Sequence, residues 1–239
     1  MKSMPNSHMR SVRFLKAFRL ALFAVPAVFL LSFPSLAAQE YGAVAGKIEY
    51  QTFRYDPDDR MLGYGVHSYD DDFNRIETAY HDDTGRYESS AEYSYDSESR
   101  LVKEVFVDYG LSTPRYTRSY YYDAAGKKIR CVDYSGSGEK LGELVYRHDR
   151  SGRIIEERHV NPAGETSYRA EITVSEGGEK LRTEVFVPGE AGEVLESYAV
   201  YEYDGRSRLT KTSIFSADGK LEWYLVHKWK EIDEGVTAE

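Results

Sequence analysis

Residues 120–129 read YYYDAAGKKI, and this stretch contains the elements that decide the fold. Asp123 follows a group of tyrosines, and Gly126 comes three positions later. An Asp, Asn or Ser that opens a four-residue segment and a Gly that closes it are typical of a type I turn. The first side chain accepts a hydrogen bond from the backbone two residues on, and glycine adopts a positive φ without a Cβ clash. The stretch therefore predicts a chain reversal between two extended segments.

Similar signals recur along the chain at a spacing of roughly 12 to 14 residues, which leaves room only for strands between them. In the second of these turns, Asn74 is the residue suited to positive φ. We predict thirteen turns, whose first residues are Asp56, Asp71, Asp82, Asp96, Asp108, Asp123, Ser135, Asp149, Asn161, Ser175, Gly189, Asp204 and Ser216.

Between the turns, apolar and polar residues alternate. In residues 165–174 one face carries Tyr168, Ala170 and Ile172, and the other carries Arg169 and Glu171. This period of two predicts half-buried strands. Short turns join neighbours, so the sequence predicts an all-β fold: an antiparallel meander of about fourteen short strands forming a curved, repeat-built sheet. Its open edges, near Lys47 and at residues 221–230, are expected to be able to pair with another copy.

The N-terminus differs from the rest of the chain. Residues 1–38 combine five basic residues, an apolar run over 20–31 and small residues at 35–38, which predicts a secretory signal peptide, with an uncleaved anchor as the alternative. We therefore expect a signal peptide (1–38), a repeat array (39–232) and a polar C-terminal tail (233–239). The expected location is the periplasm, the cell surface or the extracellular space, without membrane insertion after cleavage.

The charge composition limits the classes of partner that the chain is expected to bind. The chain has 31 basic and 40 acidic side chains. Without the five basic residues of the signal segment, 26 remain against 40, a net charge of −14. So acidic a surface repels phosphate backbones, which argues against nucleic acid as a partner. Cys131 is the only cysteine and cannot form an internal disulfide.

Every second turn is preceded by two aromatic residues, two positions apart, which share one face of a strand. Together with two tryptophans near the C-terminus, they are the best candidates for ligand binding, with a glycan or an envelope protein as the expected partner. The alternative is that cross-strand aromatic pairs only stabilise the sheet. The candidate residues are Tyr93, Tyr95, Tyr120, Tyr122, Tyr146, Tyr201, Tyr203, Trp223 and Trp229.

Aligned on these turns, the chain gives Y-x-Y-D-x-x-G-R/K-x-I/L, as in YSYDSESRL (93–101), YRHDRSGRI (146–154) and YEYDGRSRL (201–209). This motif resembles the YD repeat of bacterial Rhs-type proteins, whose tandem hairpins build curved sheets or shells. The resemblance covers most of the chain after residue 38, although Val174 and Ser175 replace the Tyr-Asp pair in one unit. It implies repeat architecture in an exported bacterial protein, and it implies no toxin activity.

The sequence contains only weak patterns for a catalytic site or a metal site. His81 and His148 stand at the tyrosine position of the repeat, so the repeat explains them, and no nucleophile stands out beside a base. Asp70, Asp72 and Asn74 have the alternate spacing of a calcium loop, but Arg75 occupies the position where such a loop needs glycine. We expect no catalytic residue, no cofactor and no metal, with these three residues as a weak metal candidate.

Three functional hypotheses follow. The first is an exported, non-enzymatic repeat protein that acts as a binding or scaffold module in the bacterial envelope or extracellular space. The second is an outer-membrane β-barrel, suggested by the number of alternating strands. The third, less favoured, is an enzyme that acts on envelope polymers.

Overall fold

The computed structural model describes residues 47–109 and 113–232. The expected signal segment, 1–38, and the expected tail, 233–239, lie outside the described residues, as does the tip of the connection at residues 110–112. The described strands belong to one compact unit.

The described elements are fourteen strands, which confirms the all-β meander. They are β1 (Lys47–Tyr55), β2 (Met61–Tyr69), β3 (Arg75–Asp82), β4 (Tyr87–Tyr95), β5 (Leu101–Asp108), β6 (Thr113–Tyr122), β7 (Lys128–Ser135), β8 (Lys140–His148), β9 (Ile154–Val160), β10 (Thr166–Val174), β11 (Lys180–Gly189), β12 (Gly192–Tyr203), β13 (Leu209–Ser216) and β14 (Leu221–Ile232).

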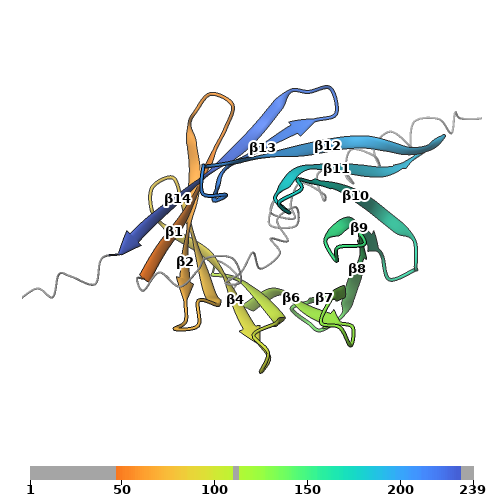
Figure 1. Cartoon of the computed structure of the whole chain (residues 1–239), viewed down its shortest axis with the longest axis horizontal. Coiled ribbons are helices and arrows are strands. Elements are labelled where there is room, and N and C mark those ends of the chain that lie inside the picture. Colours follow the sequence, from red (N-terminus) through yellow and green to blue (C-terminus); the bar gives the residue numbers. More distant parts are fainter. Residues whose placement is uncertain (1–46, 110–112, 233–239) are drawn as a thin grey trace, which may run out of the picture. The chain divides into compact units, whose positions relative to one another are not determined.

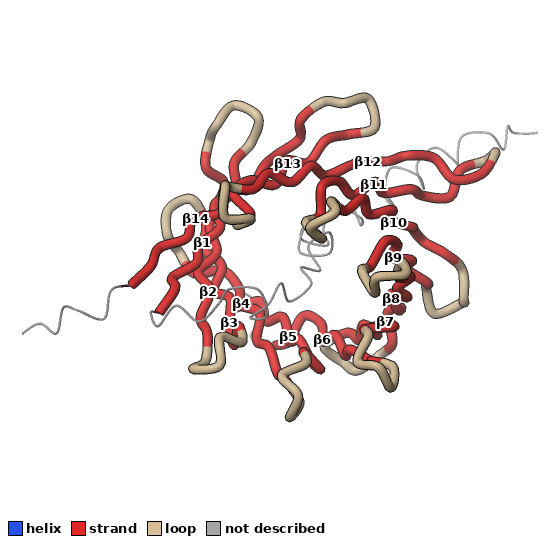
Figure 2. The backbone as a smooth tube through the Cα atoms, in the orientation of Figure 1, coloured by secondary structure: helices blue, strands red, loops and turns tan. Residues whose placement is uncertain are grey.

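The sheet is closed. Every strand pairs antiparallel with its neighbours in sequence, and β1 also pairs with β14, so the fourteen strands form a barrel (Figures 1 and 2). The closing register runs from Lys47 opposite Ile232 to Tyr55 opposite Tyr224. The two edges that the sequence left open for another copy therefore pair with each other, and that prediction is wrong. Closure satisfies the backbone groups that an open edge would expose.

Most turns have the predicted geometry. In the turn at Asp123, Gly126 N–H donates to the Asp123 carbonyl (3.0 Å), Asp123 N–H donates to the Lys127 carbonyl (2.9 Å), and Gly126 has a φ of 78°. The Asp123 carboxylate accepts the N–H groups of Ala125 and Lys127 at 2.9 Å each. One side chain thus caps two backbone donors and fixes the reversal.

The second turn begins one residue earlier than predicted. Phe73 N–H donates to the Asp70 carbonyl (3.1 Å), and Phe73 has a φ of 61° where Asn74 was expected to take positive φ. The reason is that Asp70, and not Asp71, caps the turn by accepting the N–H groups of Asp72 and Asn74 (3.0 and 2.8 Å).

The connection at Gly189 also differs from the others. Gly189 pairs with Gly192 across a two-residue tip, and Gly192 has a φ of 127°. Two-residue hairpins need positive φ in or beside the tip, and glycine supplies it at little steric cost.

The inner face of the barrel can be identified from β3, β4 and β5. Tyr80 on β3 and Phe106 on β5 have ring centroids 6.2 Å apart although β4 lies between their strands. Alternate strands are about 9–10 Å apart, so these side chains converge over Ala91, which is completely buried. Side chains converge on the concave side of a curved sheet, so these three residues lie on the inner face.

The inner face mixes apolar, aromatic and charged side chains. Its most buried charges are Arg118 on β6 and Asp133 on β7, which form two hydrogen bonds of 2.6 and 2.9 Å. Their side chains are 3% and 2% exposed. Beside them the Tyr120 hydroxyl donates to Glu104 at 2.9 Å. Charges so buried are tolerated because each is hydrogen-bonded.

Replacing Asp133 should therefore be costly. Asp133→Ala leaves the buried Arg118 guanidinium without its carboxylate, and we expect the free energy of unfolding to fall by about 3–5 kcal/mol. Glu193→Ala is the control and should cost about 1 kcal/mol or less, because Glu193 is 41% exposed and Arg169 keeps its ion pair with Glu171. Urea unfolding followed by tryptophan fluorescence measures both, and equal losses would contradict the burial argument.

Candidate functional site

The first aromatic residue of each predicted pair lies on the inner face, with a basic side chain over its ring. Arg75 lies 4.3 Å from the centroid of Tyr93, and Lys128 lies 4.4 Å from Tyr146 and 5.4 Å from Tyr120. Lys180 lies 5.6 Å from the centroid of Tyr201. Cation–π contacts of this kind use the ring face that a sugar would otherwise stack on.

The second tyrosine of three pairs, and Trp229 in a similar way, joins its strand to the preceding one. Hydroxyl groups of three tyrosines and one indole N–H each donate to a backbone carbonyl near the start of the previous strand. The pairs are Tyr95 to Arg75 (3.0 Å), Tyr122 to Leu101 (2.8 Å), Tyr203 to Lys180 (2.9 Å) and Trp229 to Leu209 (2.8 Å). Each acceptor is the first residue of β3, β5, β11 or β13, so these bonds fix the start of the strand directly after its turn.

The predicted binding residues do not form one continuous surface. Tyr120 and Tyr146 belong to a cluster with Cys131 and Leu144, against which Tyr122 packs. A second cluster joins Tyr201 to Ala199 and Ile214, with Tyr203 and Trp223 packed against it. The structure accounts for these aromatic side chains by contacts within the repeat, and their use by a ligand stays a prediction.

The weak metal candidate lies in a turn. The Asp70 carboxylate accepts two backbone N–H groups and the Asn74 amide, whose Nδ2 donates at 3.1 Å. Its oxygens are therefore engaged in capping the chain. Within the described part of the chain, no group of three or more His, Cys, Asp or Glu side chains could hold a metal ion.

A histidine cluster at the barrel seam was not anticipated. On the inner face the Tyr50 hydroxyl lies 2.5 Å from His227 Nδ1, and His227 Nε2 lies 3.0 Å from the Thr212 hydroxyl. On the other side of β1, His67 joins Thr52 (3.3 Å) and Thr78 (2.9 Å). This seam cluster spans β13, β14, β1, β2 and β3 and contains the pair of strands that closes the barrel. No sequence signal marked it. Thr52, His67 and Thr78 meet through neighbouring hairpins, whereas Tyr50 meets His227 only when β1 pairs with β14.

Burial decides the charge state of the two histidines in the seam cluster. Desolvation lowers the pKa of His227 to about 4. It also lowers the pKa of His67 well below its usual range, with smaller effects from Arg75 and His227. Tyr50 stacks between His67 and Trp229, with centroid distances of 4.5 and 4.2 Å. Both histidines are therefore neutral at pH 7 and act as hydrogen-bonding groups.

A shallow pocket lies at the rim beside the turn between β12 and β13. It has a volume of about 630 Å³ and is lined by Asp204, Gly205, Arg206, Arg208 and Trp229. Arg208 Nε forms an ion pair of 2.7 Å with Asp204. Trp229 is the one predicted binding residue among the lining residues.

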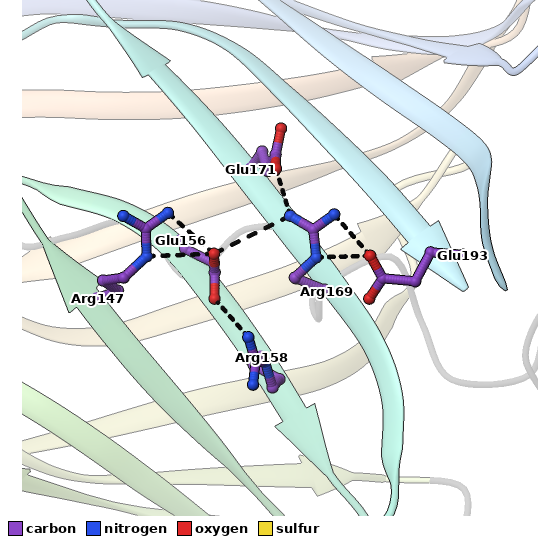
Figure 3. Close-up of polar contacts among 6 residues, drawn as sticks. All are labelled: Arg147, Glu156, Arg158, Arg169, Glu171 and Glu193. Carbon is purple, nitrogen blue, oxygen red and sulfur yellow. Dashed lines mark hydrogen bonds and ion pairs between the residues drawn. The ribbon is translucent and has the colours of Figure 1, made fainter. Parts of the chain in front are cut away.

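The outer face of β8 to β12 carries a network of ion pairs (Figure 3). Glu156 pairs with Arg147 (2.9 Å) and Arg158 (3.0 Å), and it also lies 4.0 Å from Arg169. Arg169 in turn pairs with Glu193 (2.7 Å) and with Glu171. Three cations and three anions thus alternate across the surface. The sequence shows these charges on one strand face, but only the register shows that they meet.

Comparisons with known proteins give remote likenesses. No protein-family model and no curated protein matches the sequence. A porin-like protein from Bacteroides uniformis is similar over 78% of this chain and 96% of its own, with a TM-score of 0.43 and 8% identity. A DUF1329 family protein from Desulfovibrio piger is similar over 81% of this chain and 88% of its own, with a TM-score of 0.34 and 12% identity.

The Tc holotoxin pore of Photorhabdus luminescens is similar over 67% of this chain, with a TM-score of 0.31 and 13% identity. This chain spans only 9% of that toxin chain. Likenesses at these scores support no functional conclusion.

Within residues 47–109 and 113–232, no helix is long and apolar enough to cross a membrane.

The tyrosine-to-carbonyl bonds can be tested by removing one hydroxyl. Tyr122→Phe keeps the ring and loses the bond to the Leu101 carbonyl, so we expect the free energy of unfolding to fall by about 1 kcal/mol. Tyr121→Phe is the matched control, because its partly exposed side chain lies on the opposite face. Urea unfolding would contradict the structural role of Tyr122 if both variants were as stable as the wild type.

The seam cluster predicts loss of stability in acid. The pKa of His227 is about 4 in the folded chain and about 6.5 when unfolded, so between these values the unfolded chain binds more protons. The free energy of unfolding should therefore fall as pH falls through this window, by up to about 1.4 kcal/mol per pH unit for this residue. His227→Gln should be less stable at pH 7 and depend less steeply on pH. Denaturant unfolding at intervals from pH 4 to 8 measures this, and equal slopes would contradict it.

Proposed function

We propose that this chain is an exported, non-enzymatic β-barrel that acts as a binding or scaffold module in the bacterial envelope or extracellular space. The observation that carries the proposal is the ion-pair network on the outer face of β8 to β12. On a barrel that lies in water, the more exposed members of this network, Arg147, Arg158, Glu171 and Glu193, contact solvent. Its members are partly exposed, with side-chain exposures from 12% for Glu156 to 58% for Arg147.

The same network would be costly in a bilayer. An Arg or Lys on the lipid-facing side of a transmembrane strand costs about 2–4 kcal/mol at the midplane. Arg158 and Arg169 lie directly opposite each other in the β9–β10 register, so both would enter the same layer. Other outward residues, such as Arg130 and Glu143, are also charged and form an ion pair of 3.6 Å.

A non-enzymatic role is favoured by how the buried charges are used. Arg118 is paired with Asp133, and Glu104 accepts from Tyr120. Cys131 is completely buried, and burial raises its pKa, which disfavours the reactive thiolate. These groups are engaged with one another in the wall of the barrel, as expected for structural residues.

The second candidate is an outer-membrane barrel, and the closed architecture favours it. A membrane-spanning sheet must have no free edge, and fourteen antiparallel strands joined in sequence order meet that requirement. The two candidates make opposite demands on the outer face, which would contact water in the first and lipid in the second.

Fractionation separates these candidates. We expect the native protein, expressed with its own N-terminus in a diderm host, to appear in the periplasmic or culture fraction and to stay soluble without detergent. A resident outer-membrane barrel of the same cells is the control for the membrane fraction. If the protein stayed in the pellet after carbonate washing and needed detergent to be extracted, the outer-membrane candidate would replace our proposal.

A further inference from the structure

Five rings form a row across the outer face at one side of the barrel. Along this outer aromatic row, Phe53 and Tyr64 have centroids 5.9 Å apart, Tyr64 and His81 4.7 Å, His81 and Tyr87 5.4 Å, and Tyr87 and Tyr109 4.5 Å. The row crosses β1, β2, β3 and β4 and ends just after β5. Tyr87 and Tyr109 are 37% and 47% exposed.

Most of this row differs from several other outward aromatic residues, each of which has a Lys or Arg of the same chain over its ring. Arg130 lies 4.5 Å from the ring of Tyr121, Arg182 lies 3.8 Å from Tyr198, and Lys211 lies 4.6 Å from Tyr224. Within the row, Lys228 lies 4.4 Å from Phe53. No Lys or Arg of the described residues lies over the remaining rings, those of Tyr64, His81, Tyr87 and Tyr109.

On the same outer face, two carboxylates of like charge lie directly opposite each other. Glu77 on β3 is the register partner of Glu92 on β4, which places their Cβ atoms about 5 Å apart and destabilises the pair. Neither glutamate forms an ion pair within residues 47–109 and 113–232. The cation on the adjoining strand, Lys103, lies diagonally and is paired in register with Ser94. By contrast, Arg158 and Arg169, which also lie opposite each other, form ion pairs with three glutamates.

Small side chains separate the row from the carboxylates. Along β3 the outward residues run from Glu77 through Ala79 to His81, and Ala79 pairs with Ser90 of β4. The Ser90 hydroxyl lies 3.4 Å from the Tyr109 hydroxyl. Burial and the Tyr109 hydrogen bond raise the pKa of Tyr87 to about 12, and the Glu77 carboxylate contributes to the same effect. The negative charge of Glu77 therefore acts on Tyr87 across the small side chains of Ala79 and Ser90.

Charge is concentrated on this side of the barrel. Residues 47–109 contain seven basic and sixteen acidic side chains, a net charge of −9. Residues 113–232 contain nineteen basic and twenty acidic side chains, a net charge of −1. An extended cationic ligand approaching the barrel would be steered toward β1 to β5.

We propose that the outer face of β2 to β5 binds a lysine- or arginine-rich segment of a partner protein. Its cations would lie over the tilted, exposed rings of Tyr87 and Tyr109 and between Glu77 and Glu92. The inference rests on the proposed function, since it requires this face to lie in water. Cationic side chains would contact the faces of these two tyrosine rings and the two carboxylates. They would also relieve the repulsion between the two glutamates.

A fluorescein-labelled octalysine peptide is a suitable probe, with fluorescence anisotropy measured at 150 mM NaCl on the purified protein without detergent. We expect Glu77→Gln combined with Glu92→Gln to weaken binding about tenfold, which corresponds to about 1.4 kcal/mol. Tyr87→Ser combined with Tyr109→Ser should weaken it to a similar extent. Glu171→Gln combined with Glu193→Gln removes the same charge from the opposite wall and should change the dissociation constant less than twofold.

The outcomes are distinct. Soluble protein that does not bind octalysine would overturn this inference. Equal weakening by both glutamate double variants would also overturn it, because binding would then depend only on overall charge. Protein that requires detergent to remain in solution would instead overturn the proposed function. Circular dichroism of each variant would show that the barrel is intact, and loss of binding by a folded Glu77/Glu92 variant alone supports the proposed surface.

Discussion

The structure depends on a single repeated contact, in which a short polar side chain accepts two backbone N–H groups at a chain reversal. Asp96 and Asp149 do this with oxygen-to-nitrogen distances of 2.8–3.1 Å. Each of these aspartates is also paired with an arginine four residues on. Such capped turns set the register of the two strands they join, and a one-residue slip would move every side chain to the other face. The alternation of inner and outer residues around the barrel therefore rests on the turns.

Much of the fold could be predicted from the sequence because this contact is local. The aspartates and glycines place the turns, and the period of two between them gives the strands. The exception at Asp70 has a local cause too, since three successive aspartates offer alternative caps. Closure could not be predicted in this way. Tyr50 and His227 meet across a separation of 177 residues, and no short-range pattern encodes how many strands complete the circle.

The candidate sites were harder to predict for a related reason. The aromatic residues before the turns were recognised, but their roles depend on neighbours from other strands, such as the Leu101 carbonyl for Tyr122. A tyrosine in the sequence does not reveal whether its ring faces a ligand or a cation of the same chain. Likewise, Glu77 and Glu92 look like ordinary surface residues until the register places them side by side.

The pairing of β1 with β14 has a consequence for how the protein is made. Among the fourteen described strands, β14 is synthesised after the other thirteen and, in an exported chain, leaves the translocation channel after them. Until it arrives, both β1 and β13 present unsatisfied backbone groups along their length. A chain that terminates before residue 221 would thus keep two unpaired strand edges, and it would be prone to domain swapping with other copies. Pairing of β1 with β14 removes both exposed edges and so prevents this exchange.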